Sequence, residues 1–157
     1  MTFEQRLFSW GIPSYIQTIS VDLNSENTIS IAKTLPMQQA WIYGINTYTD
    51  GVDPNNVTLI TAVQAKSLFL KIVQGDRNFV NPIRLDDLIF PFATQESRYM
   101  EVDIPGTVSI DESLILNPTA IASGRVMLVL RYISIWDQAK LIAENLIRDG
   151  GFVRTQP

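Results

Sequence analysis

The chain has 157 residues and contains neither histidine nor cysteine, the side chains from which most metal, nucleophilic and redox sites are built. Its net charge is −4 and its 12 basic residues are scattered rather than grouped in runs, which argues against direct binding to nucleic acid. The length predicts one domain with a substantial core, and a charged share of only 18% with eight Gly and eight Pro favours a β-rich domain with many turns.

No apolar run approaches the roughly 20 residues that a membrane-spanning helix needs. The longest such run ends at Leu130 and is interrupted by Arg131. Glu4 and Arg6 lie inside the first apolar stretch, which therefore lacks the unbroken apolar core of a signal peptide. We expect neither a transmembrane segment nor a signal peptide.

Residues 1–14 are interpreted as an N-terminal arm that precedes the first strand. Large apolar side chains in this arm have the spacing of one short amphipathic turn: Phe3, Leu7, Phe8 and Trp10. Residues 19–23 and 28–32 alternate between apolar and polar side chains around a turn-forming link, which predicts a hairpin. A long aromatic strand is predicted at residues 40–48, and residues 50–56 carry the strongest loop signal.

The middle of the chain continues as strands separated by turns. Pro82 is expected at a sheet edge or in a loop, because proline cannot donate a backbone hydrogen bond. Residues 85–90 fit a strand or a helical turn, and the pattern does not separate the two. Further strands are predicted at residues 57–63, 67–73, 98–104, 108–110, 114–116 and 125–135.

The final segment has the periodicity of a helix. Asp137 is predicted to cap this helix, and Gly150 with Gly151 to end it. Its apolar stripe consists of Ala139, Ile142, Ala143, Leu146 and Ile147. Within a single domain, the chain thus divides into an arm (1–14), a β-sandwich (15–136) and a C-terminal helix and tail (137–157).

About eight or nine short strands followed by one helix predict an all-β fold, an antiparallel β-sandwich with a short C-terminal α-helix. Helical stretches between the strands are too few for alternating strand–helix units. Among two-sheet folds, an eight-stranded jelly roll matches the strand count best. An immunoglobulin-like sandwich is the alternative.

Carboxylates are the remaining side chains that could carry catalysis, because glycoside hydrolysis needs two of them at a fixed separation. Glu101 and Asp103 would lie about 7 Å apart on one strand face. No aromatic sugar platform accompanies them, so a solvated strand face is the favoured interpretation. The other acidic candidates are Asp86, Asp87, Glu96, Asp111 and Glu112. We predict that the chain is not an enzyme and uses no cofactor.

The loop at residues 50–56 offers oxygen ligands of the kind that calcium prefers: Asp50, Asp53, Asn55 and Asn56. Their spacing is not that of the helix–loop–helix calcium motif. Turn chemistry explains every one of them, so no metal site is predicted.

The two apolar terminal segments have two interpretations. They pack against their own β-sandwich and cover an open end of the core, or at least one of them reaches a neighbouring subunit. The residues of the possible subunit interface are Phe3, Leu7, Phe8, Trp10, Ile142 and Leu146. Trp41 and Trp136 are expected in the core, because each lies in an otherwise apolar strand.

Four segments together resemble viral capsid jelly rolls: residues 67–75 (SLFLKIVQG), 82–88 (PIRLDDL), 98–105 (RYMEVDIP) and 124–132 (GRVMLVLRY). The chain is similar in style to the single jelly-roll vertex (penton) or spike-base proteins of tailless icosahedral bacteriophages. The likeness covers residues 35–132 as a pattern of strands and loops and carries over no functional residue. The C-terminal helix departs from a minimal vertex protein.

This resemblance implies a non-enzymatic structural virion protein, assembled in the host cytoplasm. Its partners would be copies of itself, as a homopentamer around a vertex, and the major capsid protein. The alternative is a carbohydrate- or receptor-binding module in which aromatic side chains stack on a sugar. The aromatic residues considered for that role are Trp10, Tyr15, Tyr43, Tyr48 and Tyr99.

Overall fold

The computed structural model describes residues 2–31, 40–74, 77–90, 99–105 and 113–147. Most of its regular elements are strands. They are β1 (Tyr15–Asp22), β2 (Thr28–Ser30), β3 (Ala40–Tyr48), β4 (Phe69–Gln74), β5 (Arg77–Arg84), β6 (Met100–Pro105), β7 (Leu114–Leu116) and β8 (Arg125–Ser134). The helices are α1 (Phe3–Ser9), α2 (Ala62–Ala65), the 3-10 helix η1 (Leu85–Leu88) and α3 (Ile135–Ala143).

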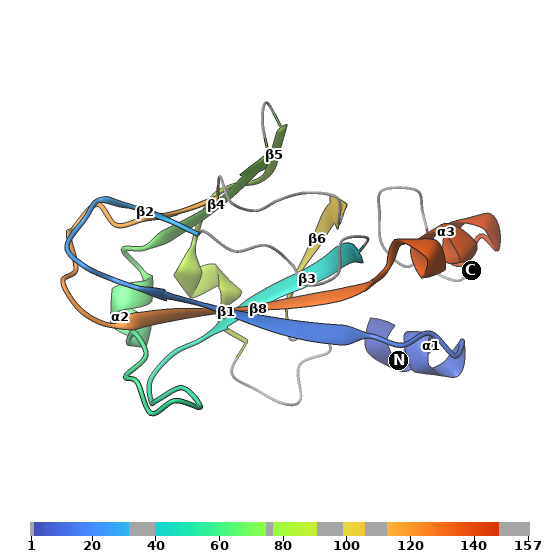
Figure 1. Ribbon diagram of the computed structural model, residues 1–157, viewed down its shortest axis with the longest axis horizontal. Helices are drawn as coiled ribbons and strands as arrows, with labels where there is room; N and C mark the ends of the chain where they lie inside the picture. The colour runs from blue at the N-terminus through green and yellow to red at the C-terminus, as the bar shows by residue number, and fades with distance from the viewer. Residues whose placement is uncertain (1, 32–39, 75–76, 91–98, 106–112, 148–157) are drawn as a thin grey trace.

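The strands form two four-stranded antiparallel sheets (Figure 1). The first sheet has the order β1-β8-β3-β6 and the second has the order β2-β7-β4-β5. The chain is therefore mostly β with a short helix after its last strand, as the sequence predicts.

The predicted hairpin between the first two strands is wrong. β1 pairs with β8, from Tyr15 opposite Tyr132 to Asp22 opposite Arg125, whereas β2 pairs with β7 in the other sheet. Instead, the segment between β1 and β2 is hydrogen-bonded to the segment between β7 and β8. There the Asn117 side chain donates to the backbone carbonyl of Glu26. Turn-forming residues indicate that the chain changes direction, but not which strand it then meets.

One hydrophobic core lies between the two sheets. The first sheet contributes apolar side chains such as Ile42 and Leu128, and the second contributes side chains such as Leu70 and Ile115. Each of these is at most 2% exposed, and burial of one such side chain stabilises the fold by about 1.5–3 kcal/mol. The sheets therefore pack face to face, and the period-2 alternation of β1 places Ile19 and Val21 in this core.

Several expectations for the connecting segments are settled. Residues 57–63 are not a strand, because Thr61 caps α2 in a reciprocal pair with Gln64. Residues 85–88 form the 3-10 helix η1. Pro82 lies in β5, which is an edge strand, as expected. The strand predicted at residues 108–110 lies outside the described residues.

The C-terminal helix α3 also differs from expectation in its N-cap residue. α3 begins at Ile135 and is capped by Ser134, whose hydroxyl accepts from the backbone N–H of Trp136, so Asp137 is not the cap. The helix ends at Ala143, and the predicted stop at Gly150 and Gly151 lies outside the described residues. Among the helices of the described ranges, none has the length and apolar content to cross a membrane.

Candidate interaction site at the terminal helices

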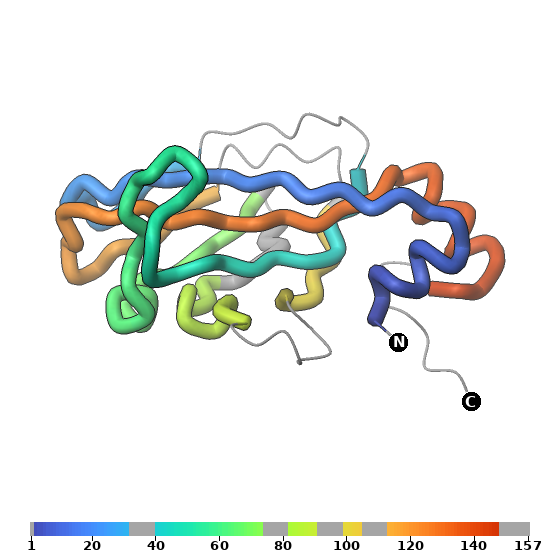
Figure 2. The backbone as a smooth tube through the Cα atoms, turned by 90° about the horizontal axis from the view of Figure 1, so that it is seen from below, coloured from blue at the N-terminus to red at the C-terminus, as the bar shows by residue number. Residues whose placement is uncertain are grey.

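α1 and α3 lie together at one end of the molecule, although the whole β region separates them in the sequence (Figure 1). Both run beyond the ends of the first sheet's strands, as the tube in Figure 2 also shows. A second cluster of buried residues, which we call the terminal cluster, joins these helices to that sheet. Its buried members are Leu7, Ile12, Trp41, Tyr43, Tyr99, Ile133, Leu141 and Ile147.

The terminal cluster makes β3 a strand that is buried on both faces. Ile42 belongs to the core between the sheets, whereas Trp41 and Tyr43 belong to the terminal cluster, and all three are 0% exposed. The ring of Phe3 in α1 lies 4.9 Å from that of Tyr43 in an edge-on arrangement. The first helix is therefore held by ring packing on the outer face of the sheet.

A partly buried ion pair connects α1 to this cluster. The guanidinium of Arg131 in β8 donates to the Glu4 carboxylate and lies 5.2 Å from the ring centroid of Tyr99. The Arg131 side chain is 9% exposed and that of Glu4 is 38% exposed. The pair ties α1 to β8, because Glu4 is the counter-charge of the buried Arg131. Glu4 itself remains partly hydrated.

The polar groups of the cluster mostly bond to one another. The Tyr43 hydroxyl shares a hydrogen bond of 2.5 Å with the Ser14 hydroxyl, and the Trp41 indole N–H donates to Asp103 at 2.6 Å. Burial raises the pKa of Tyr43 to about 12 and also raises the pKa of Tyr99. Both phenols therefore stay protonated at neutral pH, and neither is suited to act as a base.

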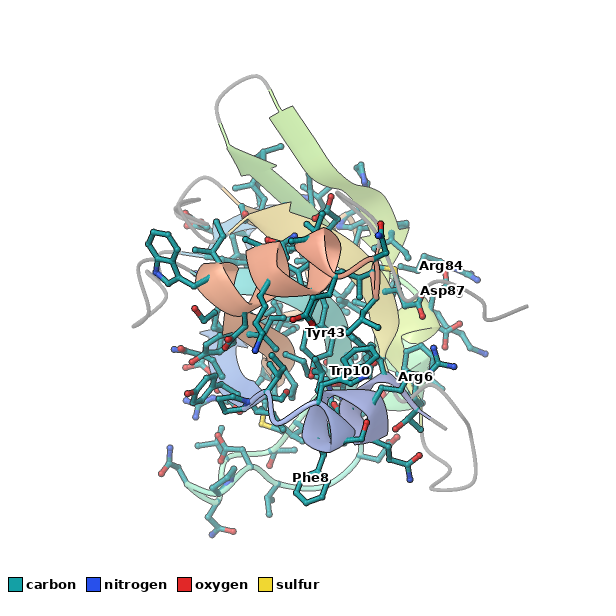
Figure 3. All side chains as sticks on the ribbon, turned by 90° about the vertical axis from the view of Figure 1, so that its right-hand side faces the viewer. Arg6, Phe8, Trp10, Tyr43, Arg84 and Asp87 are labelled. Carbon is teal, nitrogen blue, oxygen red and sulfur yellow. The ribbon has the colours of Figure 1, made fainter. Side chains whose placement is uncertain are left out.

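The sequence-predicted interface residues fall into three groups: one buried, one exposed and four partly buried. Leu7 is 0% exposed within its own chain, so it is corrected from a surface residue to a core residue. Phe8 is 86% exposed and points away from the sheet, while Trp10 and Tyr43 lie between the two helices (Figure 3). The remaining members are partly buried against the terminal cluster: Phe3, Trp10, Ile142 and Leu146.

Trp136 was expected in the core and is 71% exposed instead, so that expectation is wrong. It lies on α3 rather than in the preceding strand, and Lys140 and Ala143 share its exposed face. That spacing of three and four residues is the signal that could have placed Trp136 outside the core. The terminal helices thus present two large apolar side chains to solvent, Phe8 and Trp136.

The opposite end of the first sheet is closed by a charged network. Arg125 donates to Asp22 at 2.7 Å and to Asp53 at 2.6 Å. Asp53 also accepts from the backbone N–H groups of Asn55 and Val57, so both of its carboxylate oxygens bond to protein donors. Hydrogen bonds from Arg125 and from the Val57 amide, respectively, lower the pKa of Asp22 and of Asp53. These hydrogen bonds hold the loop at residues 50–56, the segment considered above for calcium binding.

The other acidic candidates are dispersed. Asp103 accepts from Trp41, Glu101 is exposed, and Asp86 lies 3.8 Å from Arg84. In the ranges that the structure describes, no three acidic side chains come together as a cation site. Glu96, Asp111 and Glu112 lie outside those ranges.

The second sheet carries a shallow apolar groove with a volume of about 430 Å³. It is lined by residues of three strands and of the links beside them: Asn27, Phe69, Pro82, Leu116 and Pro118. Its lining is almost entirely apolar, so it offers contact area rather than a reactive group.

Comparison with known protein families, with curated proteins and with solved structures finds no match to this chain.

Proposed function

We propose that this chain is an eight-stranded jelly roll that serves as a structural virion protein, a capsid vertex (penton) component that forms homo-oligomers and contacts the major capsid protein. The strand order of the two sheets is the observation that carries the proposal. In chain order, the pairs β1–β8, β2–β7, β3–β6 and β4–β5 are all neighbours. That nesting is what results when one long hairpin is folded over itself.

Rolling such a hairpin into two layers brings β3 beside β8 and β4 beside β7, and both contacts are present. This wrapped arrangement with two four-stranded sheets supports the proposed jelly roll, a fold that viral capsid domains use. An immunoglobulin-like sandwich pairs its first two strands in one sheet. Here β1 and β2 belong to different sheets, so the strand order favours the jelly roll.

The surface of the terminal helices supports the proposed self-association. Phe8 and Trp136 are 86% and 71% exposed, and large aromatic side chains dominate the energetics of many protein interfaces. The polar groups of the terminal cluster pair mainly with one another, which leaves this end suited to apolar contact. The virion role and the number of five copies rest on the resemblance of the sequence to vertex proteins.

Two measurements test this proposal. Sedimentation velocity of the purified chain should give the mass of five copies, and an antibody against the chain should label particle vertices in electron micrographs. The double variant Phe8→Ser with Trp136→Ser should lower the assembled mass, while Val63→Ser at α2 removes an equally exposed apolar side chain and should leave it unchanged. A chain that stays monomeric and is absent from particles contradicts the proposal.

A carbohydrate- or receptor-binding module is the second candidate. Tyr15 and Tyr48 are 39% and 48% exposed, as a stacking platform requires. Tyr43 and Tyr99, by contrast, are buried in the terminal cluster and are unavailable to a sugar. A glycan array that gives no signal with the purified chain removes this candidate.

A further inference from the structure

In the described part of the chain, β1 is an edge strand, paired with another strand on one side only. It is the outer strand of the first sheet and pairs with β8 over its whole length without any shift in register. Figure 2 shows it as a long, nearly straight segment beside β8. Within the ranges that the structure describes, no strand pairs with its other side. Such an edge is a template for another strand.

The other three sheet edges carry features that discourage pairing, and β1 carries fewer of them. β2 is only three residues long, β5 contains Pro82 and shifts in its register with β4, and β6 carries two acidic residues and ends at Pro105. β1 contains no proline and no lysine. Its single charged residue is Asp22, which is paired with Arg125 at the end of the strand.

The exposed side chains of β1 are compatible with a second strand lying along its free edge. Ile16 is 59% exposed and Tyr15 is 39% exposed, and both lie at the end of the strand nearest the terminal helices. Thr18 and Ser20 complete the exposed row between Ile16 and Asp22, and neither carries a charge. An apolar residue followed by small polar residues is a sequence that a neighbouring strand can cover without burying a charge.

The backbone hydrogen bonds indicate which residues of β1 face its free edge. The N–H of Leu23 donates to the carbonyl of Gly124 at 3.0 Å, so Leu23 points toward the β8 side of the ladder. In an antiparallel pair this orientation alternates from one residue to the next. The backbone N–H and C=O groups of Ile16, Thr18 and Ser20 therefore point away from β8.

We propose that β1 pairs antiparallel with β1 of a second copy of this chain about a twofold axis, with Thr18 opposite Thr18 and Ile16 opposite Ser20. This register places residues with outward-pointing backbone groups opposite one another, as a ladder requires. A shift of one repeat in one direction would put Ile16 opposite Asp22, and a shift in the other direction would shorten the overlap. The result is one continuous sheet formed from two four-stranded sheets.

This contact does not depend on the virion role and uses a surface different from Phe8 and Trp136. A twofold contact closes after two copies, whereas the ring contact expected around a vertex joins each copy to two neighbours. The masses therefore separate the two contacts: edge pairing alone gives a dimer and ring association alone gives a pentamer. Failure of either leaves the other intact.

Single cysteine substitutions test the register directly, because the chain contains no cysteine of its own. In the proposed pairing the two Thr18 Cα atoms lie about 5.5 Å apart, within the range that a disulfide can bridge. Thr18→Cys should therefore form a covalent dimer on mild oxidation. Ser20→Cys is the matched control on the same exposed row, since its two copies would lie about 13 Å apart along the strand. It should form no covalent dimer, and adding Ile16→Cys to it should restore cross-linking.

Thr18→Lys tests the same contact without oxidation, through the dissociation constant of the dimer. It places two like charges opposite each other at the twofold axis, which should raise the dissociation constant of the dimer at least tenfold in sedimentation equilibrium. Thr28→Lys, at an exposed position of the short edge strand β2, should leave it unchanged. Circular dichroism would verify that both variants are folded. No covalent dimer from folded Thr18→Cys, or equal cross-linking of Thr18→Cys and Ser20→Cys, would overturn the proposal.

Discussion

The ring of Tyr99 lies directly against Gly44, so closely that a Cβ atom at Gly44 would come within 2.4 Å of the tyrosine Cδ2 atom. Gly44 lies where the pairing register of β3 shifts against both of its neighbours. The missing side chain therefore leaves the space in which Tyr99 reaches the outer face of the sheet and meets Arg131. A glycine in the interior of a buried strand is explained here by close approach of a ring.

The first prediction concerns this contact. Gly44→Ala should lower the free energy of unfolding by about 1–3 kcal/mol, because the new methyl group overlaps a buried ring. Tyr99→Ala should also destabilise the fold, but adding Gly44→Ala to it should cost much less than in the wild-type chain, because the ring atoms that meet the new methyl group are gone. Urea unfolding of the four proteins measures this coupling. Additive effects of the two substitutions would mean that the ring does not occupy the space beside Gly44.

The second prediction separates the two members of the Glu4–Arg131 pair. Glu4→Gln leaves the buried Arg131 without its counter-charge and should lower the free energy of unfolding by about 3 kcal/mol. Arg131→Met fills the same space with apolar atoms and should cost about 1 kcal/mol or less, since the remaining Glu4 is partly hydrated. Among the residues that the structure describes, none bonds to the Nε atom of Arg131, which further limits what its removal costs. Urea unfolding would contradict this account if Arg131→Met were the more damaging change.

The third prediction uses two adjacent residues of α1. Leu7→Ala should lower the free energy of unfolding by about 2–5 kcal/mol, because Leu7 is 0% exposed and its loss leaves a cavity in the terminal cluster. Phe8→Ala should change it by no more than about 0.5 kcal/mol, because Phe8 is 86% exposed. Thermal or urea unfolding at a protein concentration that keeps the chain monomeric is the appropriate measurement. Equal losses would place Phe8 inside the core.

The fourth prediction concerns acid. The pKa values of Asp22 and Asp53 are lowered in the folded chain, through hydrogen bonds from Arg125 and from the Val57 amide, respectively. A carboxyl group with a lowered pKa stabilises the fold above its unfolded pKa of about 4, and this stability is lost as the pH falls through the folded pKa. The urea midpoint of the wild-type chain should therefore fall steeply below about pH 4.

Arg125→Gln should lower stability at neutral pH and flatten this acid dependence, because the aspartates lose the guanidinium that favours their charged form. Arg84→Gln is the matched control. It removes the same charge from a half-exposed arginine whose contacts to Asp86 and Asp87 are 3.8 and 4.0 Å. Its acid profile should parallel that of the wild-type chain. A flattened profile in both variants would assign the effect to net charge instead.

Local patterns predicted most of the strands but not all of the connections. Strands β1, β3 and β8 follow from alternation or from unbroken apolar runs, because those patterns need only the strand's own residues. Residues 57–63 carry the same kind of apolar run, yet Thr61 and Gln64 start a helix there. The threonine and glutamine three residues apart are a capping signal, whereas the prediction of a strand rested on the β-branched and apolar composition alone.

The candidate site was predicted in part, since four of the six terminal residues chosen from the sequence line the outside of the terminal cluster. The sequence could not separate Leu7 from Phe8, because neighbouring positions on a short helix differ only in which one faces the sheet. It also could not foresee that Arg131, in the most apolar strand, meets Glu4 from the other end of the chain. Such contacts join residues distant in sequence and leave no local pattern.

The amino-acid sequence by itself determined most of the extended stretches and the lack of histidine and cysteine side chains, because side-chain period and composition are properties of each segment alone. Only the tertiary structure decided that β1 meets β8 rather than β2, and that Leu7 is buried while Trp136 is exposed. The physical reason is that strand partners are selected by the packing of distant segments against a common core. No single segment contains the information on that competition.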